Sequence, residues 1–230
     1  MVCGGDQYAI GRNGNIGSSH ALREDLERVG SIFQTTMDSE IFLHLFVRNL
    51  YRGFENALVK TCESLRGAFS FVMLTSRGDM VGIKDPHGFH PLCLGLLDGS
   101  YVLASETCAL DLVGAEFIRE LNPGEIVIIN GAGIKSIQME RPEYGSMCVF
   151  EFVYFARPDS CINGLTVYDA RKAQGCMLAK QAPVDAHLVM PFPDSGIYAA
   201  IGYSQESGIP FEMGMIKNHY VGRTFMQPTQ

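Results

Sequence analysis

Apolar side chains recur every three to four positions in three segments of the first 65 residues, with polar residues between them. This spacing places the apolar side chains on one face of a helix. The predicted helices are a segment containing Leu22, Leu26 and Val29, a segment beginning near Ser39, and residues 54–65. A short strand over 7–11 comes before them, and we expect it to run into a turn at 12–15.

Short β-type runs follow, each bounded by Gly, Pro, Asn or Asp. The predicted strands cover residues 68–75, 80–84, 101–104 and 125–130. Helices followed by many short strands indicate an α+β layered fold, in which sheets and helices pack face to face.

The pattern changes after Arg141-Pro142, where apolar runs alternate with helix-like segments. It predicts strands over 148–155, 187–190 and 211–216, with helices over 167–179 and 195–203. This order is typical of a parallel α/β sheet. We therefore expect one domain over residues 1–145 and the beginning of a second over 146–230, with the second incomplete because such a sheet needs several crossover units.

Composition excludes several classes of protein. With 47% hydrophobic and 19% charged residues among 230, the chain is suited to folding around a core. The balance of 18 basic against 25 acidic residues argues against a nucleic-acid or membrane-surface binder. No segment reaches the ~18 apolar residues of a membrane span. The seven cysteines form no C-x-x-C pair, and with no export signal we expect reduced thiols in a cytoplasmic protein.

Two features of the first domain could carry chemistry. The backbone N–H groups and Asn amide of Asn13-Gly14-Asn15 could face an oxyanion, although Asn-Gly is also a common hairpin turn. Asp38 comes directly before a predicted helix, where an Asp is either a helix cap or a carboxylate free to pair with a substrate ammonium.

Two features of the second domain suit an anionic ligand. Asp194, Ser195 and Gly196 lie between a predicted strand and helix, where backbone donors and a hydroxyl suit phosphate, although an ordinary capped turn has the same residues. A later segment could close over such a ligand or be a solvated loop, and its candidate residues are Lys217, Tyr220, Arg223 and Thr224.

Taken in order, the motifs are more specific than any one of them. Residues 13–15, 30–36 with Asp38 and Glu40, 85–88, and 104–107 resemble the glutaminase domain of N-terminal-nucleophile amidotransferases. Residues 151–160 and 220–225 narrow the resemblance to the amidophosphoribosyltransferase family.

The resemblance implies a glutaminase-type layered α+β domain, followed by the start of an α/β phosphoribosyltransferase-type domain. It implies glutamine hydrolysis, with ammonia channelled to phosphoribosyl pyrophosphate to give 5-phosphoribosylamine, the first committed step of purine synthesis. The implied partners are these two substrates, without nucleic acid or membrane, and the full-length parent is expected to be a homo-oligomer.

The resemblance also implies roles for single residues. Asn13 and Gly14 match the oxyanion hole, and Asp38 matches the carboxylate that holds the glutamine α-ammonium. In the phosphoribosyl half, the matching residues are Asp194, Ser195 and Gly196 in the pyrophosphate loop, with Ser195 near Mg²⁺, and Lys217, Tyr220, Arg223 and Thr224 in the flexible loop. Cys148 matches the first ligand of a 4Fe–4S cluster that one branch carries in its full-length members, although a cluster needs several thiolates.

Departures from the family pattern lead us to expect that this chain alone is inactive. The nucleophilic N-terminal Cys is absent, because Cys3 would not be terminal after removal of Met1. Arg12 stands where the family has His, and His90 and His219 stand where it has Arg. We therefore expect an internal part of the enzyme, lacking both ends.

Two alternatives stay open. The first is a non-catalytic binding or assembly module, or a truncated remnant. The second is another amidotransferase with the same glutaminase fold, against which the motifs at 154–160 and 220–225 speak.

Overall fold

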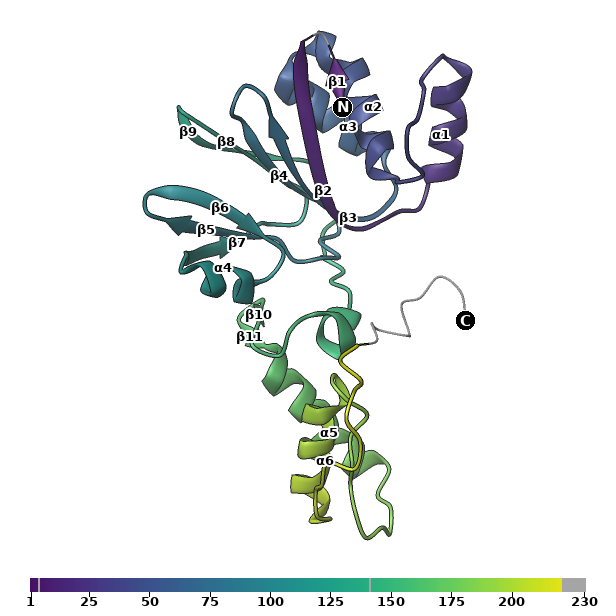
Figure 1. Cartoon of the computed structure of the whole chain (residues 1–230), viewed down its shortest axis with the longest axis vertical. Coiled ribbons are helices and arrows are strands. Elements are labelled where there is room, and N and C mark those ends of the chain that lie inside the picture. Colours follow the sequence, from purple (N-terminus) through teal and green to yellow (C-terminus); the bar gives the residue numbers. More distant parts are fainter. Residues whose placement is uncertain (4, 141, 221–230) are drawn as a thin grey trace. The chain divides into compact units, whose positions relative to one another are not determined.

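The computed structural model describes residues 1–3, 5–140 and 142–220. The chain divides into two compact units, Met1–Cys148 and Val149–Gln230, each of which is described by itself (Figure 1). Within the described residues, no helix has the length and apolar character needed to cross a membrane.

The first unit is built around a six-stranded sheet in which all neighbouring strands are antiparallel. Its order is β1 (Val2–Cys3), β2 (Asp6–Ile16), β3 (Gly67–Thr75), β4 (Met80–Lys84), β8 (Glu125–Asn130) and β9 (Gly133–Gln138). β2 pairs with β3 along nine residues, from Tyr8 opposite Thr75 to Ile16 opposite Gly67. β1 covers only the beginning of the other side of β2.

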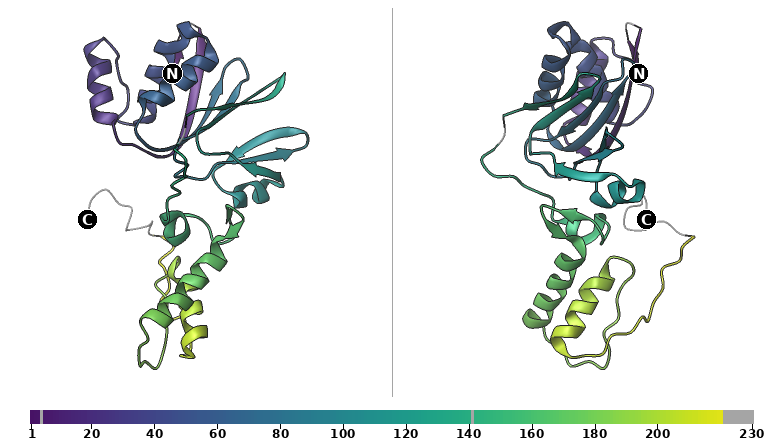
Figure 2. Two further views of the ribbon diagram at one scale, coloured as in Figure 1. Left: turned by 180° about the vertical axis from the view of Figure 1, so that it is seen from behind. Right: turned by 90° about the vertical axis from the view of Figure 1, so that its left-hand side faces the viewer.

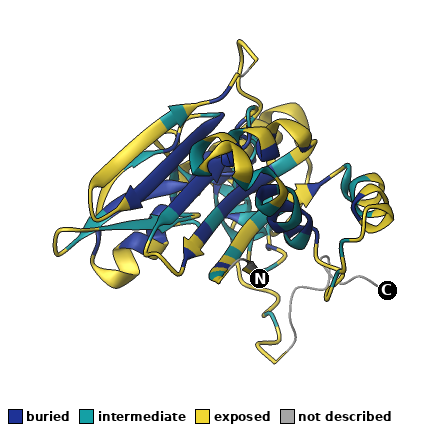
Figure 3. Ribbon diagram, turned by 90° about the horizontal axis from the view of Figure 1, so that it is seen from above, coloured by how far each residue is buried: buried dark blue, intermediate teal, exposed yellow. Residues whose placement is uncertain are grey.

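Two helices cover one face of this sheet, as the views in Figure 2 show. The helices before β3 are α1 (Ser19–Arg28), α2 (Ser39–Asn49) and α3 (Phe54–Ser64), with a 3-10 turn at Leu50–Arg52. Phe42 and Phe46 of α2 and Leu58 of α3 are fully buried against Phe71 and Ile83 of the sheet. The apolar stripe seen in the sequence thus forms the main core (Figure 3).

A three-stranded sheet covers the other face. Its order is β6 (Ser100–Ala104), β5 (Cys93–Leu97) and β7 (Glu116–Glu120). A Cβ at Gly82 would lie 2.8 Å from Cδ1 of Leu103, so glycine allows the sheets to approach closely at this point. α4 (Thr107–Val113) covers the outer side of this sheet with the fully buried Leu110. The predicted α+β layered fold is confirmed.

The second unit contains two packed helices, α5 (Val167–Gln181) and α6 (Gly196–Ser207), and a hairpin of β10 (Cys161–Ile162) and β11 (Leu165–Thr166). Thr166 is the N-cap of α5, and its Oγ1 accepts a hydrogen bond from the Asp169 N–H at 3.2 Å. A Cβ at Gly175 would lie 1.9 Å from the Ala199 carbonyl oxygen, so the two helices meet through glycine.

The strand predicted over 148–155 is wrong. Residues Glu151–Phe155 form a π-helical turn instead. Arg171 of α5 is buried, and it donates from Nε to the Phe152 carbonyl at 2.5 Å and from Nη2 to the Ala156 carbonyl at 2.9 Å. These carbonyls are therefore satisfied by a side chain rather than by a neighbouring strand.

The strands predicted over 187–190 and 211–216 are also wrong. In the part of the chain that the structure describes, their only β-type pairing is an isolated parallel bridge between Val189 and Phe211. Most of these residues are exposed, and no further described strand lies beside them. An apolar run with no neighbouring strand has no ladder to join.

Candidate active site

β2 presents one open edge to its surroundings. The Gly17 N–H donates to the Arg66 carbonyl at 2.7 Å, and the Ser76 N–H donates to the Gln7 carbonyl at 2.9 Å. Gln7 and Gly17 therefore bond to the residues that directly flank β3. Because bonded positions alternate in an antiparallel ladder, the odd-numbered residues of β2 bond to β3, and the even-numbered residues point their backbone N–H and C=O groups away from it. Among the described residues, β1 covers this edge only up to Tyr8, whose N–H donates to the Met1 carbonyl at 2.8 Å.

Asn13 and Gly14 lie within β2, so the turn predicted at 12–15 is wrong. Asn13 is paired opposite Ser70 and Gly14 opposite Phe69. A hairpin at Asn-Gly would require the chain to return at once as a strand, but the next element is α1. The Gly14 N–H consequently points out of the open edge.

Gly14 occupies a position that requires glycine. Its φ is +108°, and a Cβ would lie 2.2 Å from the Ala68 carbonyl oxygen and 2.9 Å from Cδ2 of His90. Any larger residue would therefore displace the backbone that carries the N–H.

His90 lies beside Gly14 because hydrogen bonds to a side chain of the turn at 85–88 fix that turn. The Asp85 carboxylate is fully buried and accepts the N–H groups of His87 and Gly88, each at 2.9 Å. It also accepts the Phe89 N–H at 3.1 Å. These hydrogen bonds lower the pKa of Asp85, but burial outweighs them and raises the pKa above its ordinary value. The motif at 85–88 thus positions His90 beside Gly14, a role that the sequence did not indicate.

Asp38 stands at the N-cap position of α2, but its side chain makes no capping bond. Its Oδ2 accepts the Ile16 N–H at the open edge of β2, at 2.9 Å. Its Oδ1 lies 2.6 Å from Nε of Arg12 as an ion pair without hydrogen-bond alignment. The Asp38 side chain is 8% exposed, so this is a nearly buried carboxylate with one oxygen available to a cation.

Arg12 lies along the same edge. Its Nη1 donates to the Gly14 carbonyl, while its Nε faces Asp38. The structure therefore brings Asp38 and Gly14 together at one edge through Arg12.

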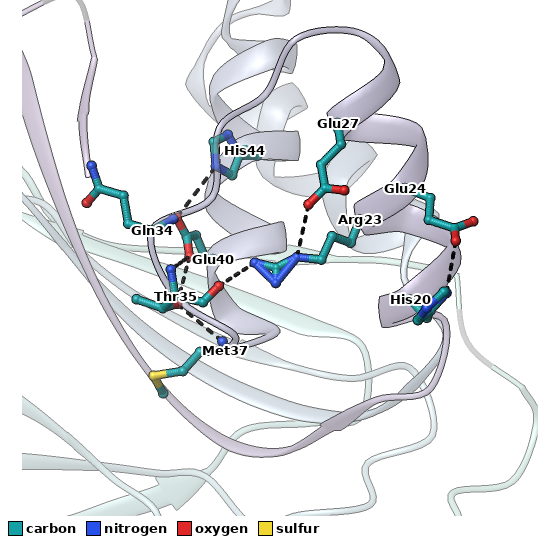
Figure 4. Close-up of polar contacts among 9 residues, drawn as sticks. All are labelled: His20, Arg23, Glu24, Glu27, Gln34, Thr35, Met37, Glu40 and His44. Carbon is teal, nitrogen blue, oxygen red and sulfur yellow. Dashed lines mark hydrogen bonds and ion pairs between the residues drawn. The ribbon is translucent and has the colours of Figure 1, made fainter.

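Glu40 holds the loop that leads to Asp38 (Figure 4). Its Oε1 accepts the Gln34 N–H at 2.8 Å, and its Oε2 accepts the Thr35 N–H at 2.8 Å and the Thr35 hydroxyl at 2.7 Å. Burial opposes the charge of Glu40, but these donors outweigh it and hold the pKa below its usual value. His44 Nε2 lies 3.8 Å from Glu40 Oε1. In the sequence, Glu40 was only part of a motif, and its position in the first turn of α2 was the available signal.

A groove of about 830 Å³ runs beside this loop, at the β1 end of the open edge. Its lining is apolar at Ile10, Met37 and Leu43, and polar at Thr35 and His44. The groove thus lies beside the candidate site, and Arg12, Gly14 and Asp38 are not among its lining residues.

In the second unit, three predicted residues lie around the start of α6. Ser195 stands at the N-cap position without a side-chain capping bond, and Gly196 begins the helix. Asp194 Oδ2 lies 3.4 Å from Lys217 Nζ, so the structure joins this turn to the predicted flexible loop. Tyr220 is fully exposed, and Arg223 and Thr224 lie outside the described residues.

The described residues do not form a metal centre by themselves. Over 1–3, 5–140 and 142–220, no three His, Cys, Asp or Glu side chains gather closely enough to hold a metal ion. Cys148 is half-buried, and its N–H donates to the Phe89 carbonyl at 2.9 Å. One thiolate is fewer than an iron–sulfur cluster needs, so the described residues do not fit a cluster.

Comparisons with known proteins agree with the resemblance seen in the sequence. Residues 1–112 match the family model described as a glutamine amidotransferase domain. The amidophosphoribosyltransferase of Bacillus subtilis is 46% identical over 222 residues, which cover 96% of this chain and 46% of that protein. The amidophosphoribosyltransferase of Archaeoglobus fulgidus is 45% identical over 224 residues, covering 96% of this chain and 49% of that protein.

Solved structures extend the agreement to the fold. The glutamine phosphoribosylpyrophosphate amidotransferase of Bacillus subtilis, complexed with ADP and GMP, superposes with a TM-score of 0.90 at 44% identity, covering 100% of this chain and 50% of that chain. A structure described as the allosteric regulatory enzyme of purine biosynthesis gives a TM-score of 0.89 at 44% identity, over 99% of this chain and 49% of that chain. We therefore identify the chain as a homologue of the amidophosphoribosyltransferases, spanning about half the length of the relatives it matches.

Proposed function

We propose that the chain supplies the glutamine-binding and phosphoribosyl pyrophosphate-binding residues of an amidophosphoribosyltransferase. In this reaction, glutamine is hydrolysed to glutamate and ammonia. The ammonia then displaces pyrophosphate from phosphoribosyl pyrophosphate and gives 5-phosphoribosylamine. The names of the relatives, which are transferases acting with these substrates, support this proposal.

The observation that carries the proposal is the carboxylate of Asp38 at the open edge of β2. Oδ2 is fixed on the Ile16 N–H at 2.9 Å, and Oδ1 has no aligned hydrogen bond. Oδ1 suits the α-ammonium of glutamine, because a nearly buried carboxylate is stabilised by a cation.

Gly14 and Asn13 suit the other end of the substrate. When a thiolate attacks the side-chain amide, the carbonyl oxygen becomes an oxyanion, and the Gly14 N–H and the Asn13 amide would donate to it. A thiol outside this set would act as nucleophile and form a thioester while ammonia leaves, and water would then release glutamate.

In the second unit, the start of α6 would hold the pyrophosphate group. Backbone N–H groups at a helix N-terminus attract phosphate, and Ser195 adds a hydroxyl. Mg²⁺ keeps several waters and takes phosphate oxygens from its substrate, so Ser195 would be one contact among several. Lys217, beside Asp194, supplies a positive charge for the same ligand, and Tyr220, Arg223 and Thr224 belong to the proposed closing loop. The parent enzyme is proposed to be a cytoplasmic homo-oligomer, and the free, buried thiol of Cys62 suits a reducing compartment.

The glutamine site is tested by titrating the 230-residue chain with L-glutamine in a calorimeter. We expect binding that Asp38→Asn weakens at least about tenfold, because the ammonium loses its counter-ion. Asp25→Asn, on the exposed surface of α1, is the matched control and should bind as the wild type does. Equal binding by Asp38→Asn and wild type would contradict the proposal.

The same samples are assayed for ammonia release. We expect none from the chain alone, because the thiol nucleophile is not among the residues of the site. Ammonia release that Cys3→Ala abolished would show instead that this chain contains its own nucleophile.

A further inference from the structure

The Arg12–Asp38 pair places a cation of the protein where the proposed function requires a cation of the ligand. Asp38 has two carboxylate oxygens, and Oδ2 is committed to the Ile16 N–H at 2.9 Å. The remaining Oδ1 lies 2.6 Å from Arg12 Nε. Two cations at one oxygen repel each other, so Arg12 and a ligand ammonium would compete for Oδ1.

The geometry of the pair shows that Arg12 can leave. Nε approaches Oδ1 without hydrogen-bond alignment, so the oxygen has a lone pair that a better-placed donor could use. The Arg12 side chain is 26% exposed, against 8% for Asp38, so the guanidinium can turn into water while the carboxylate stays. Asp38 would not remain without a cation, because an unpaired buried charge is costly. A ligand ammonium that replaced Arg12 would therefore keep Asp38 paired with a cation.

Arg12 also obstructs the edge itself. Its Nη1 donates to the Gly14 carbonyl, next to the N–H that is the candidate oxyanion donor. The guanidinium thus bridges the ammonium position at Asp38 and the strand at Gly14.

We propose that Arg12 is a resident counter-ion that competes with the substrate's α-ammonium for Asp38 and so limits the affinity of the glutamine site. The inference rests on the proposed function, since it assigns Asp38 to the ammonium group. It adds that Arg12 determines how tightly ligands with an ammonium bind, and that ligands lacking this group do not gain from its removal.

The test compares L-glutamine with 4-carbamoylbutanoate, which is glutamine without its amino group. Both are titrated into the 230-residue chain and three variants. Arg12→Gln removes the charge, Arg12→Lys keeps it, and Arg28→Gln is the matched control on the exposed side of α1. We expect Arg12→Gln to bind L-glutamine about fivefold tighter than the wild type and tighter than Arg12→Lys, Arg28→Gln to bind as the wild type does, and 4-carbamoylbutanoate to gain nothing.

Weaker or unchanged glutamine binding by Arg12→Gln would overturn the inference, since it would mean that Arg12 grips the ligand or is irrelevant to it. If no variant binds L-glutamine, the proposed function fails, and the exchange is judged by nitrogen-15 NMR of the Arg12 Nε–H group in the wild-type chain. Ethylammonium chloride should then shift this resonance to that of a solvent-exposed arginine in wild type and leave it unchanged in Asp38→Asn. No shift in wild type would overturn the exchange as well.

Discussion

The two units of this chain differ in how completely their apolar side chains are covered. In Met1–Cys148, helices, sheets and α4 enclose three buried clusters that contain Phe42, Leu94 and Leu110 respectively. In the second unit, the side chains of Phe192 and Ile216 are 76% and 82% exposed. The first unit therefore has a core of its own, whereas the second is held mainly by the contact between α5 and α6.

The difference shows what a strand requires beyond a suitable sequence. Met80–Lys84 and residues 187–190 are both short apolar runs, and both were predicted as strands. The first became β4 because β3 and β8 pair with its two sides. The second found only a bridge to Phe211. Helices α5 and α6 formed without a neighbouring strand, because a helix makes its backbone hydrogen bonds within itself.

The comparison is tested most severely by removing a side chain from the core of the first unit. Phe71 is fully buried, with its ring centroid 4.8 Å from that of Phe42 and 5.1 Å from that of Phe69. Phe71→Ala should cost about 3–5 kcal/mol of stability, from lost burial and the resulting cavity. Hydrogen exchange read by mass spectrometry should show reduced protection in β2, β3 and β4.

Protection of α5 and α6 should stay unchanged in Phe71→Ala if the two units unfold separately. Phe117→Ala, at a side chain that is 46% exposed on β7, is the control and should have little effect. A parallel loss in α5 and α6 would mean that the two units unfold as one.

The converse experiment perturbs the second unit. A Cβ at Gly175 would lie 1.9 Å from the Ala199 carbonyl oxygen, so Gly175→Ala should push α5 and α6 apart. We expect a cost of about 1–3 kcal/mol from overpacking, although alanine favours a helix over glycine by about 1 kcal/mol. Exchange should accelerate in both helices and not in β3. Gly196→Ala serves as control, because its Cβ would make only an ordinary contact, 3.8 Å from Phe192; equal protection in both variants would contradict the close contact.

The sequence identified helices and the inner strands of the first unit better than its outer elements. The apolar stripes of α2 and α3 and the run of β3 are continuous, and their patterns match their burial. β9 and β7 are largely exposed, and the sequence analysis did not identify them, nor did it identify β5 or α4. The exposed strands β7 and β9 lack an apolar face, so the hydrophobic pattern does not mark them. This reason does not apply to β5, which is apolar and is buried over its first three residues.

The site shows a different limit of sequence reasoning. An Asp before a helix is compatible with a cap and with a ligand carboxylate, and the sequence alone does not separate them. The Asp38 carboxylate instead meets Ile16, which is 22 residues earlier, and Arg12 of the same strand. The turn expected at 12–15 failed for a related reason, since pairing with β3 at residues far along the chain keeps Asn13 and Gly14 extended. Both outcomes depend on tertiary contacts that local patterns do not contain.

Lowering the pH should destabilise the first unit more than the second, and this effect should be smaller than those of the core substitutions. Glu125 in β8 is buried, and burial opposes its charge. Arg119, at 2.7 and 2.8 Å, and Ser136, at 2.6 Å, outweigh that effect and lower the pKa of Glu125 from 4.5 to about 2. A depressed pKa means that the unfolded chain binds more protons, so this stabilisation is complete above pH 4.5 and is lost as the pH falls toward 2. Because Arg119 is 38% exposed and solvent screens the pair, we expect a loss of about 1–2 kcal/mol.

The exposed Arg157–Asp159 pair of the second unit should contribute little over the same range, because both side chains are more than half exposed, at 62% and 53%. Urea unfolding of wild type and Glu125→Gln, followed between pH 6 and 2.5 by exchange in β8 and in α5, measures both effects. The stability gap between the two proteins should narrow in β8 as the pH falls and stay near zero in α5. A gap in β8 that does not change with pH would show that Glu125 stabilises the first unit by packing and hydrogen bonding rather than by its charge.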